Sequence, residues 1–110
     1  MEIASRKEGK VVIMTVRGRM DAITATEFDK EIGEIIGKEE KLIIIDLSGL
    51  DYISSAGLRS MLSASKTIKG EGGNIILTSL KDVVREVFEI SGFSAILPIY
   101  ESVETALLKV

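Results

Sequence analysis

Cysteine and histidine are both absent from the 110-residue sequence. Without cysteine the chain has no disulfide, no thiol nucleophile and no thiolate ligand for a metal. Without histidine it lacks the commonest general base and the commonest metal ligand in proteins. A serine hydrolase needs a base beside its nucleophile, and in this chain only a lysine remains for that role. We therefore predict that the protein is not an enzyme and needs no cofactor.

The motifs of nucleotide-binding proteins and of lysine-assisted hydrolases are also missing. The phosphate-loop spacing G-x-x-x-x-G-K does not occur, and no G-x-G-x-x-G follows a predicted strand. The glycine-rich residues 70–73 precede a strand instead of a helix, which indicates a turn. The S-x-x-K spacing from Ser63 to Lys66 falls in the middle of a predicted helix, so we interpret it as incidental.

Net charge is low, because 14 lysines and arginines oppose 17 aspartates and glutamates, for a formal charge of −3. A slightly acidic chain argues against direct binding of nucleic acid. The amino-terminal segment MEIASRKEGK lacks the apolar core of a signal peptide, and no apolar run reaches the length that crosses a bilayer. A chain of this length that is 45% hydrophobic suits one globular domain, residues 1–110. We expect a cytoplasmic protein with no membrane partner.

The most informative stretch is LIIIDLSGLDYISSAGLR, near the middle of the chain. Its leading apolar residues, 42–45, predict a short buried strand, because most of them are β-branched. Gly49 and Asp51 predict a turn after this strand. Ser54 and Ser55 then begin a predicted helix, since apolar and small residues recur at helical spacing beyond them. These positions are Leu58, Met61, Leu62, Ser65 and Ile68.

Strands and helices alternate along the rest of the chain. Further strands are predicted at residues 2–7, 11–17, 74–78 and 95–100. The first two form a hairpin, and Pro98 places the last strand at an edge of the sheet. The predicted helices begin near Thr24, Ser54, Ser79 and Ser102. This order predicts an α/β fold with a mixed, largely parallel sheet, an N-terminal β-hairpin and about four helices.

Helical periodicity also predicts the core. In the first helix, Thr24 and Glu27 have the spacing of a capping box, and apolar residues follow on one face. The apolar faces of the helices and the central strand together predict a set of largely buried side chains. These are Phe28, Ile32, Ile44, Leu58, Leu62, Val87 and Phe88.

The two serines have a structural and a functional interpretation. Serine is a preferred helix N-cap, so one of Ser54 and Ser55 is expected to fill that role, and capping alone explains the pair. Alternatively, the second serine is a modification site, because its hydroxyl would lie on the surface at a helix start. Ala56 and Gly57 follow it, and their small side chains would let the backbone of another protein approach closely.

Three aspartates, Asp21, Asp46 and Asp51, are candidates to gather at one end of the predicted sheet. Three carboxylates are a possible ligand set for Mg²⁺. Aspartates at the ends of loops are more often caps and turn formers, however. We favour that interpretation and predict no metal site.

The run DLSGLDYISSAGL, residues 46–58, resembles the signature of the STAS domain, and in particular of the bacterial anti-sigma factor antagonists. The sequence GRMD at residues 18–21 matches the glycine-x-hydrophobic-aspartate pattern with which that family ends its second strand. The order of the elements and the length fit as well, so the resemblance covers essentially the whole chain.

The resemblance implies a partner-switching protein. In that family the unphosphorylated antagonist binds an anti-sigma factor that is also an ATP-dependent serine kinase, and this binding releases the sigma factor. Phosphorylation of a serine at the helix start switches the binding off. A metal-dependent serine phosphatase resets the antagonist.

Position in the motif assigns the phosphorylated serine to Ser55, two residues before Gly57, and assigns Asp21 to an acidic residue near it. Family members often have aspartate just before this serine and serine or threonine just after it, where this chain has Ser54 and Ala56. Ser54 is therefore the second candidate for the acceptor. The residues that the resemblance implies for partner binding are Asp21, Ser54, Ser55, Ala56, Gly57 and Arg59.

A second hypothesis comes from a different class of function. A STAS-like domain can be an interaction or ligand-binding subunit of another assembly, such as a signalling scaffold or a lipid or anion transport complex. The two serines would then act only as caps. A neighbouring gene for an anti-sigma kinase would favour the first hypothesis, and neighbouring genes for membrane transporters would favour the second.

Overall fold

The computed structural model describes all 110 residues and begins with an antiparallel hairpin of β1 (Glu2–Glu8) and β2 (Val11–Met20). Gly9 makes the turn with a φ of +60°, which glycine adopts without steric cost. Successive side chains of β2 enter the core on opposite faces of the sheet, so this strand is buried on both sides. The predicted hairpin is confirmed, with both strands slightly longer than predicted.

The sheet has the strand order β1-β2-β3-β5-β6, with β1 antiparallel to β2 and the other neighbours parallel. Its centre is β3 (Leu42–Asp46), which lies between β2 and β5 (Asn74–Thr78). The predicted interior strand at residues 42–45 is therefore confirmed. Its neighbours on both sides satisfy its backbone hydrogen bonds, and its side chains are buried on both faces.

The turn predicted at Gly49 and Asp51 is partly wrong, because Leu50–Ile53 forms a further strand, β4. This strand pairs in parallel with the last residues of β2. β2 has 10 residues and its neighbour β3 has only 5, so β4 supplies backbone partners for the part of β2 that extends beyond β3. Asp51 is consequently an exposed strand residue, and the turn is confined to Ser48 and Gly49.

The last strand, predicted at residues 95–100, is shorter than predicted. A single 3₁₀ turn, η1 (Phe93–Ala95), takes up the beginning of this segment, and only β6 (Ile99–Tyr100) joins the sheet. The edge position that Pro98 predicted is confirmed. Pro98 has no amide hydrogen to donate, but its carbonyl accepts a hydrogen bond from the Leu77 amide over 2.9 Å.

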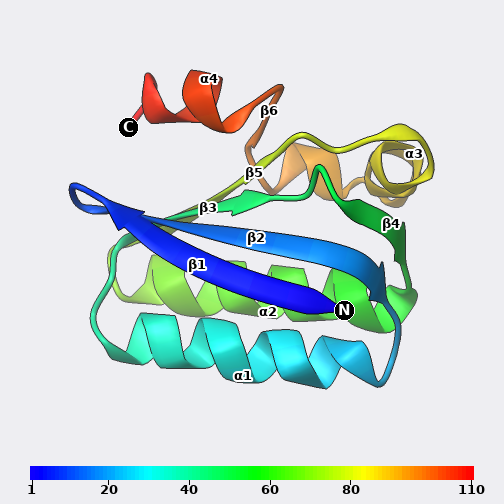
Figure 1. Ribbon diagram of the computed structural model, residues 1–110, viewed down its shortest axis with the longest axis horizontal. Coiled ribbons are helices and arrows are strands. Elements are labelled where there is room, and N and C mark those ends of the chain that lie inside the picture. The colour runs from blue at the N-terminus through cyan, green and yellow to red at the C-terminus, as the bar shows by residue number, and fades with distance from the viewer.

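Three helices cover one face of the sheet: α1 (Thr24–Gly37), α2 (Ser55–Gly70) and α3 (Asp82–Ser91). The short α4 (Val103–Leu107) lies on the opposite face (Figure 1). α1 and α2 run side by side in the same direction, with both N-terminal ends at the same end of the molecule (Figure 1). None of the helices combines the length and the apolar character needed to cross a membrane.

The sheet divides the hydrophobic core into two clusters. A cluster of 23 buried residues lies between the sheet and α1, α2 and α3, and a cluster of 6 lies under α4. Most of the predicted core side chains are buried, namely Phe28, Ile32, Ile44, Leu58 and Phe88. Leu62 and Val87 are only half-buried, because each lies at the border between the buried and exposed faces of its helix.

The predicted caps of the last two helices have different outcomes. Ser102 caps α4 as predicted, and its Oγ accepts a hydrogen bond from the Thr105 amide over 3.0 Å. Ser79 does not cap α3, because it lies too far before the helix and has a φ of +64°. Lys81 occupies the N-cap position instead and makes no capping side-chain hydrogen bond.

Candidate functional site

The start of α2 separates the roles of the two serines. Ser54 is the N-cap: its backbone is extended, with φ −89° and ψ 173°, and its Oγ accepts a hydrogen bond from the Gly57 amide over 3.2 Å. Ser55 is the first residue of the helix and is exposed. The capping expected of one serine therefore falls to Ser54, and the Ser55 hydroxyl is not needed for it.

Two parallel strands, β2 and β4, position this helix start. Met20 and Ile53 are paired at the strand ends, and the Met20 carbonyl accepts a hydrogen bond from the Ser54 amide over 2.8 Å. Both Met20 and Ile53 are buried, which fixes the strand ends against the core. Asp21 follows Met20 directly, so the structure brings Asp21 to the same end of the sheet as Ser54 and Ser55.

Asp21 caps α1 and shapes the turn before it. Its Oδ1 accepts hydrogen bonds from the amides of Ile23 over 3.0 Å and Thr24 over 2.9 Å. The Thr24 hydroxyl accepts a hydrogen bond from the Asp21 amide over 2.8 Å and donates one to the Arg19 carbonyl. The predicted capping box of Thr24 and Glu27 is wrong, because the backbone is already helical at Ile23 and Thr24 lies inside the first turn.

The same hydrogen bonds lower the pKa of Asp21 below its usual value of 3.8, with the Thr24 amide as the largest cause. Desolvation opposes this shift, and the positive charge of Arg19 adds to it. Asp21 is therefore a carboxylate at neutral pH and places a negative charge at this end of the sheet. Its structural role is established by these contacts, whereas a role in partner binding stays a prediction.

Gly57 is buried against the protein's own strands. A Cβ at this position would lie 2.8 Å from Ile53 Cγ1 and 2.9 Å from Met20 Sδ, closer than carbon atoms pack. The sequence-based interpretation, in which Gly57 leaves room for a partner's backbone, is corrected by this burial. Glycine is needed here so that the first turn of α2 can pack on the ends of β2 and β4, and its effect on Ser55 is indirect.

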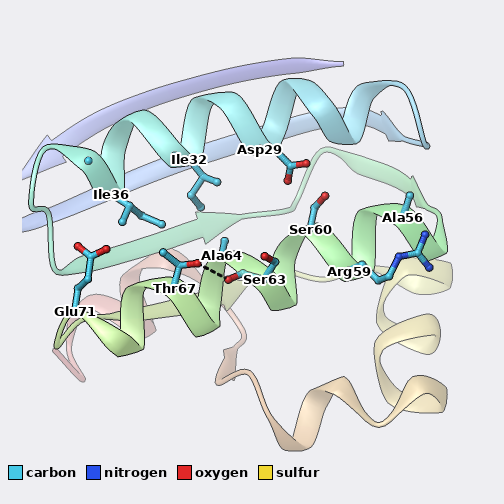
Figure 2. A pocket seen from close by; sticks show the side chains of 12 residues that line it. Asp29, Ile32, Ile36, Ala56, Arg59, Ser60, Ser63, Ala64, Thr67 and Glu71 are labelled. Atoms are coloured by element: carbon cyan, nitrogen blue, oxygen red, sulfur yellow. Dashed lines mark hydrogen bonds between the residues drawn. The ribbon is translucent and has the colours of Figure 1, made fainter.

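Ala56 and Arg59 contribute to a groove between α1 and α2 that sequence reasoning missed (Figure 2). Ala56 is half-buried and Arg59 is exposed. Ala56 follows Ser55 directly and Arg59 lies about one helical turn beyond it, so the groove begins beside the candidate acceptor. One signal in the sequence could have predicted this groove: small residues, such as Gly33 and Ser63, recur at helical spacing along both helices.

The other two aspartates do not join Asp21 in a cluster. Asp46 accepts a hydrogen bond from the Ser48 amide over 3.0 Å in the turn after β3, and Asp51 is exposed on β4. No three carboxylate side chains come close enough together to hold a metal ion. The interpretation as cap and turn former is confirmed for Asp21 and Asp46 by their hydrogen bonds.

A cation–π contact next to the site was also not predicted. The guanidinium of Arg19 lies over the ring of Tyr52, 4.3 Å from its centroid. These residues are paired across β2 and β4, so the contact ties together the two strands that position the start of α2. Both residues lie within the two sequence motifs, but their pairing depends on β4, which was not predicted.

The fold and this geometry define a class of protein: a small α/β domain that presents an exposed serine on the first turn of a helix, beside the end of a short strand. The family model described as the STAS domain matches residues 2–106, and the chain therefore belongs to the STAS domain family. The family resemblance and the fold class expected from the sequence are both confirmed.

Relatives in this family are named as anti-sigma factor antagonists. BtrV of Bordetella bronchiseptica, assigned as an anti-sigma factor antagonist, is 39% identical over 106 residues, which are 96% of this chain and 91% of the relative. The anti-sigma-B factor antagonist of Listeria monocytogenes is 33% identical over 100 residues, which are 90% of this chain and 86% of the relative.

Solved structures of named antagonists share the fold. A protein from Thermotoga maritima, assigned as an anti-sigma factor antagonist, superposes with a TM-score of 0.93 at 24% identity, over 98% of this chain and 93% of that chain. SpoIIAA of Bacillus, solved in its phosphorylated form, superposes with a TM-score of 0.76 at 19% identity, over 98% of both chains. At these identities the structural comparisons show the fold, and the family assignment rests on the sequence matches.

Proposed function

We propose that this protein is an anti-sigma factor antagonist that works by partner switching. Its unphosphorylated form binds an anti-sigma factor that is an ATP-dependent serine kinase, and this binding releases a sigma factor. The kinase transfers phosphate to Ser55, which ends the binding, and a metal-dependent serine phosphatase removes the phosphate. In this role the chain is a cytoplasmic binding protein and kinase substrate, without catalytic activity of its own.

The division of roles between the two serines carries the proposal. Because Ser54 caps the helix through the Gly57 amide, Ser55 can be modified without loss of the cap. Ser55 is exposed at the first helical position, where a kinase can reach its Oγ. The names of the sequence relatives support the role of antagonist, and SpoIIAA, which shares the fold, exists in a phosphorylated form.

The proposed contact surface surrounds Ser55. Ala56 follows it, and Arg59 lies about one helical turn further along α2, on the same side of the helix. Asp21 adds a carboxylate from the neighbouring strand end. We expect the kinase to contact these residues, and we expect Gly57 to act only by holding the first turn of α2 in place.

A phosphate on Ser55 would meet two opposing electrostatic effects of similar size. The phosphate adds roughly −1.5 to −2 charges at pH 7. The N-terminus of a helix favours a negative charge by about 0.3–1 kcal/mol, while the Asp21 carboxylate opposes it through solvent and salt. The domain should therefore keep its fold, and the switch should act at the interface, where bulk and negative charge meet a surface that fits a bare hydroxyl.

Mass spectrometry after incubation with the purified anti-sigma kinase of the host and ATP tests the proposal. We expect one phosphate on Ser55 in the wild type and none in Ser55→Ala. Ser54→Asp is the matched control, because it removes the other hydroxyl and keeps a capping oxygen, and it should still be phosphorylated. Modification confined to Ser54 would contradict the assignment of the acceptor. No phosphate on any serine would favour a STAS interaction subunit of another assembly.

A further inference from the structure

The groove between α1 and α2 extends along the whole of α2, from Ala56 beside Ser55 to Glu71 just beyond the helix (Figure 2). Its volume is about 580 Å³. At about 1.5 Å per residue, the distance from residue 56 to residue 71 along the helix is roughly 22 Å. An open groove of this length suits a peptide segment better than a compact small molecule.

Small residues on both helices keep the groove open. Gly33 and Gly37 line it from α1, and Ser60, Ser63 and Ala64 line it from α2. A Cβ added at Gly33 or at Gly37 would meet no atom within 4 Å. The free space therefore begins directly at the α1 backbone, and an occupant can approach both helices closely.

Ser60 points its hydroxyl into this groove. The residue is only 9% exposed, and its side chain lies between the two helices, directed toward α1 (Figure 2). The Ser60 hydroxyl makes no hydrogen bond to the protein, whereas the Thr67 hydroxyl in the same groove donates to the Ser63 carbonyl over 3.0 Å. The Ser60 hydroxyl is reached by solvent in the groove and has no protein partner, so an occupant of the groove can bind it.

Two opposite charges line the half of the groove nearest Ser55. Asp29 belongs to α1 and Arg59 to α2, and the ion pairs of the structure involve neither of them. An occupant with an acidic side chain toward Arg59 and a basic side chain toward Asp29 would pair both charges.

We propose that the groove is a docking site for a peptide segment of the anti-sigma kinase, which extends the contact at Ser55 along α2 through the shared residues Ala56 and Arg59. The inference rests on the proposed function, which brings that kinase to Ser55. Because the groove begins at the next residue, Ala56, a kinase bound at Ser55 already lies at its entrance. Docking in the groove would set the affinity and the choice of kinase without taking part in phosphate transfer.

Steady-state phosphorylation kinetics test this docking. The probe is the purified anti-sigma kinase of the host, the same protein as in the mass-spectrometric test of the proposed function. Gly33→Met fills the groove from α1, and Thr67→Met fills it from α2. Gly70→Met is the matched control, because Gly70 does not line the groove and a Cβ there also meets no atom within 4 Å. Circular dichroism and thermal melting establish that each variant is folded.

We expect Gly33→Met and Thr67→Met to raise the KM for this chain about tenfold or more while kcat stays within about twofold, since the lost contacts are ground-state binding contacts. Gly70→Met should change neither constant. An unchanged KM in both groove variants, with Ser55 still phosphorylated, would overturn the docking site alone. Altered self-association in sedimentation with an unchanged KM would assign the groove to a second copy of the chain. Absence of phosphorylation in the wild type would overturn the proposed function and this inference together.

Discussion

Gly57 lies so close to Met20 that a Cβ at residue 57 would be 2.9 Å from the Met20 Sδ. Met20 is itself fully buried, and its carbonyl accepts the hydrogen bond from the Ser54 amide. The first turn of α2, which carries Ser55, therefore rests directly on the end of β2. The position of the candidate acceptor is coupled to the packing of the core.

This contact predicts that Gly57→Ala destabilises the protein. The added methyl group must displace the buried side chains of Met20 and Ile53, so we expect a loss of roughly 1–3 kcal/mol in the free energy of unfolding. Gly33→Ala is the control, since its Cβ meets no atom within 4 Å and should raise stability by up to about 1 kcal/mol. Urea unfolding measures both, and equal stability of the two variants would contradict the packing argument.

The two serines should respond differently to alanine. Ser54→Ala removes the cap of α2 and should cost about 0.5–2 kcal/mol. Ser55→Ala removes an exposed hydroxyl and should change stability by no more than about 0.5 kcal/mol. Chemical denaturation of the two single variants checks this difference. A larger loss in Ser55→Ala than in Ser54→Ala would reverse the assignment of cap and acceptor.

Local sequence patterns predicted most of the fold. The apolar, β-branched residues 42–45 indicated an interior strand, and the periodicity around Phe28 and Ile32 indicated a buried helix face. β4 was missed because its existence depends on the part of β2 that extends beyond β3, which is a relation between strands distant in sequence. The cap of α1 was misplaced because Asp21 and Thr24 are both good caps, and only the path of the chain selects Asp21.

The candidate site was predictable in its location but not in its details. The motif placed two serines at a helix start, but either serine can cap, and only the backbone conformation assigns the cap to Ser54. The burial of Gly57 depends on Met20 and Ile53, which approach it through strand pairing. The groove depends on the space between α1 and α2, which no local pattern determines.

The half-burial of Leu62 gives a graded prediction for the core. Leu62→Ala should cost roughly 1–2 kcal/mol, below the usual cost for a fully buried leucine, because solvent already reaches part of this side chain. Phe88→Ala, at a fully buried position, should cost about 3–5 kcal/mol. Equilibrium unfolding compares the two directly. A similar loss in both variants would show that Leu62 is packed more tightly than its exposure indicates.

The cap formed by Asp21 should make stability depend on acidic pH. In the folded state the pKa of Asp21 lies below its usual value of 3.8. The ionised carboxylate therefore contributes fully to the free energy of unfolding above about pH 4, and this contribution is lost as the pH falls through the lower, folded pKa. The stability difference between the wild type and Asp21→Asn should therefore shrink as the pH is lowered in this range. A pH series of thermal melts measures it, and a constant difference would contradict the assigned hydrogen bonds.

Asp21→Asn also separates the structural role of this residue from its proposed role in binding. Asparagine keeps an acceptor oxygen for the amides of Ile23 and Thr24 but removes the charge. Lost phosphorylation with nearly native melting would support a contact between the carboxylate and the kinase. A lowered melting temperature with normal phosphorylation would show that Asp21 acts only as a cap.

The switch itself predicts a variant that is folded but unable to bind. Ser55→Asp places a negative charge at the N-terminus of α2, where the helix dipole favours it and the Asp21 carboxylate opposes it. The free energy of unfolding should change by no more than about 0.5 kcal/mol, and circular dichroism should stay native. Binding to the kinase should nonetheless be lost, because a misplaced charge across an interface can cost several kcal/mol. Each 1.4 kcal/mol or so raises Kd about tenfold, so such a cost weakens the complex by several powers of ten.

Ser55→Ala is the counterpart in the same binding assay. It keeps a small, neutral side chain at the interface, so it should bind the kinase with a Kd close to that of the wild type and resist release when ATP is added. Calorimetry or surface plasmon resonance with the unphosphorylated protein measures both variants. If Ser55→Asp melts far below the wild type, the charge acts through the fold of α2, and a switch located at the interface is excluded.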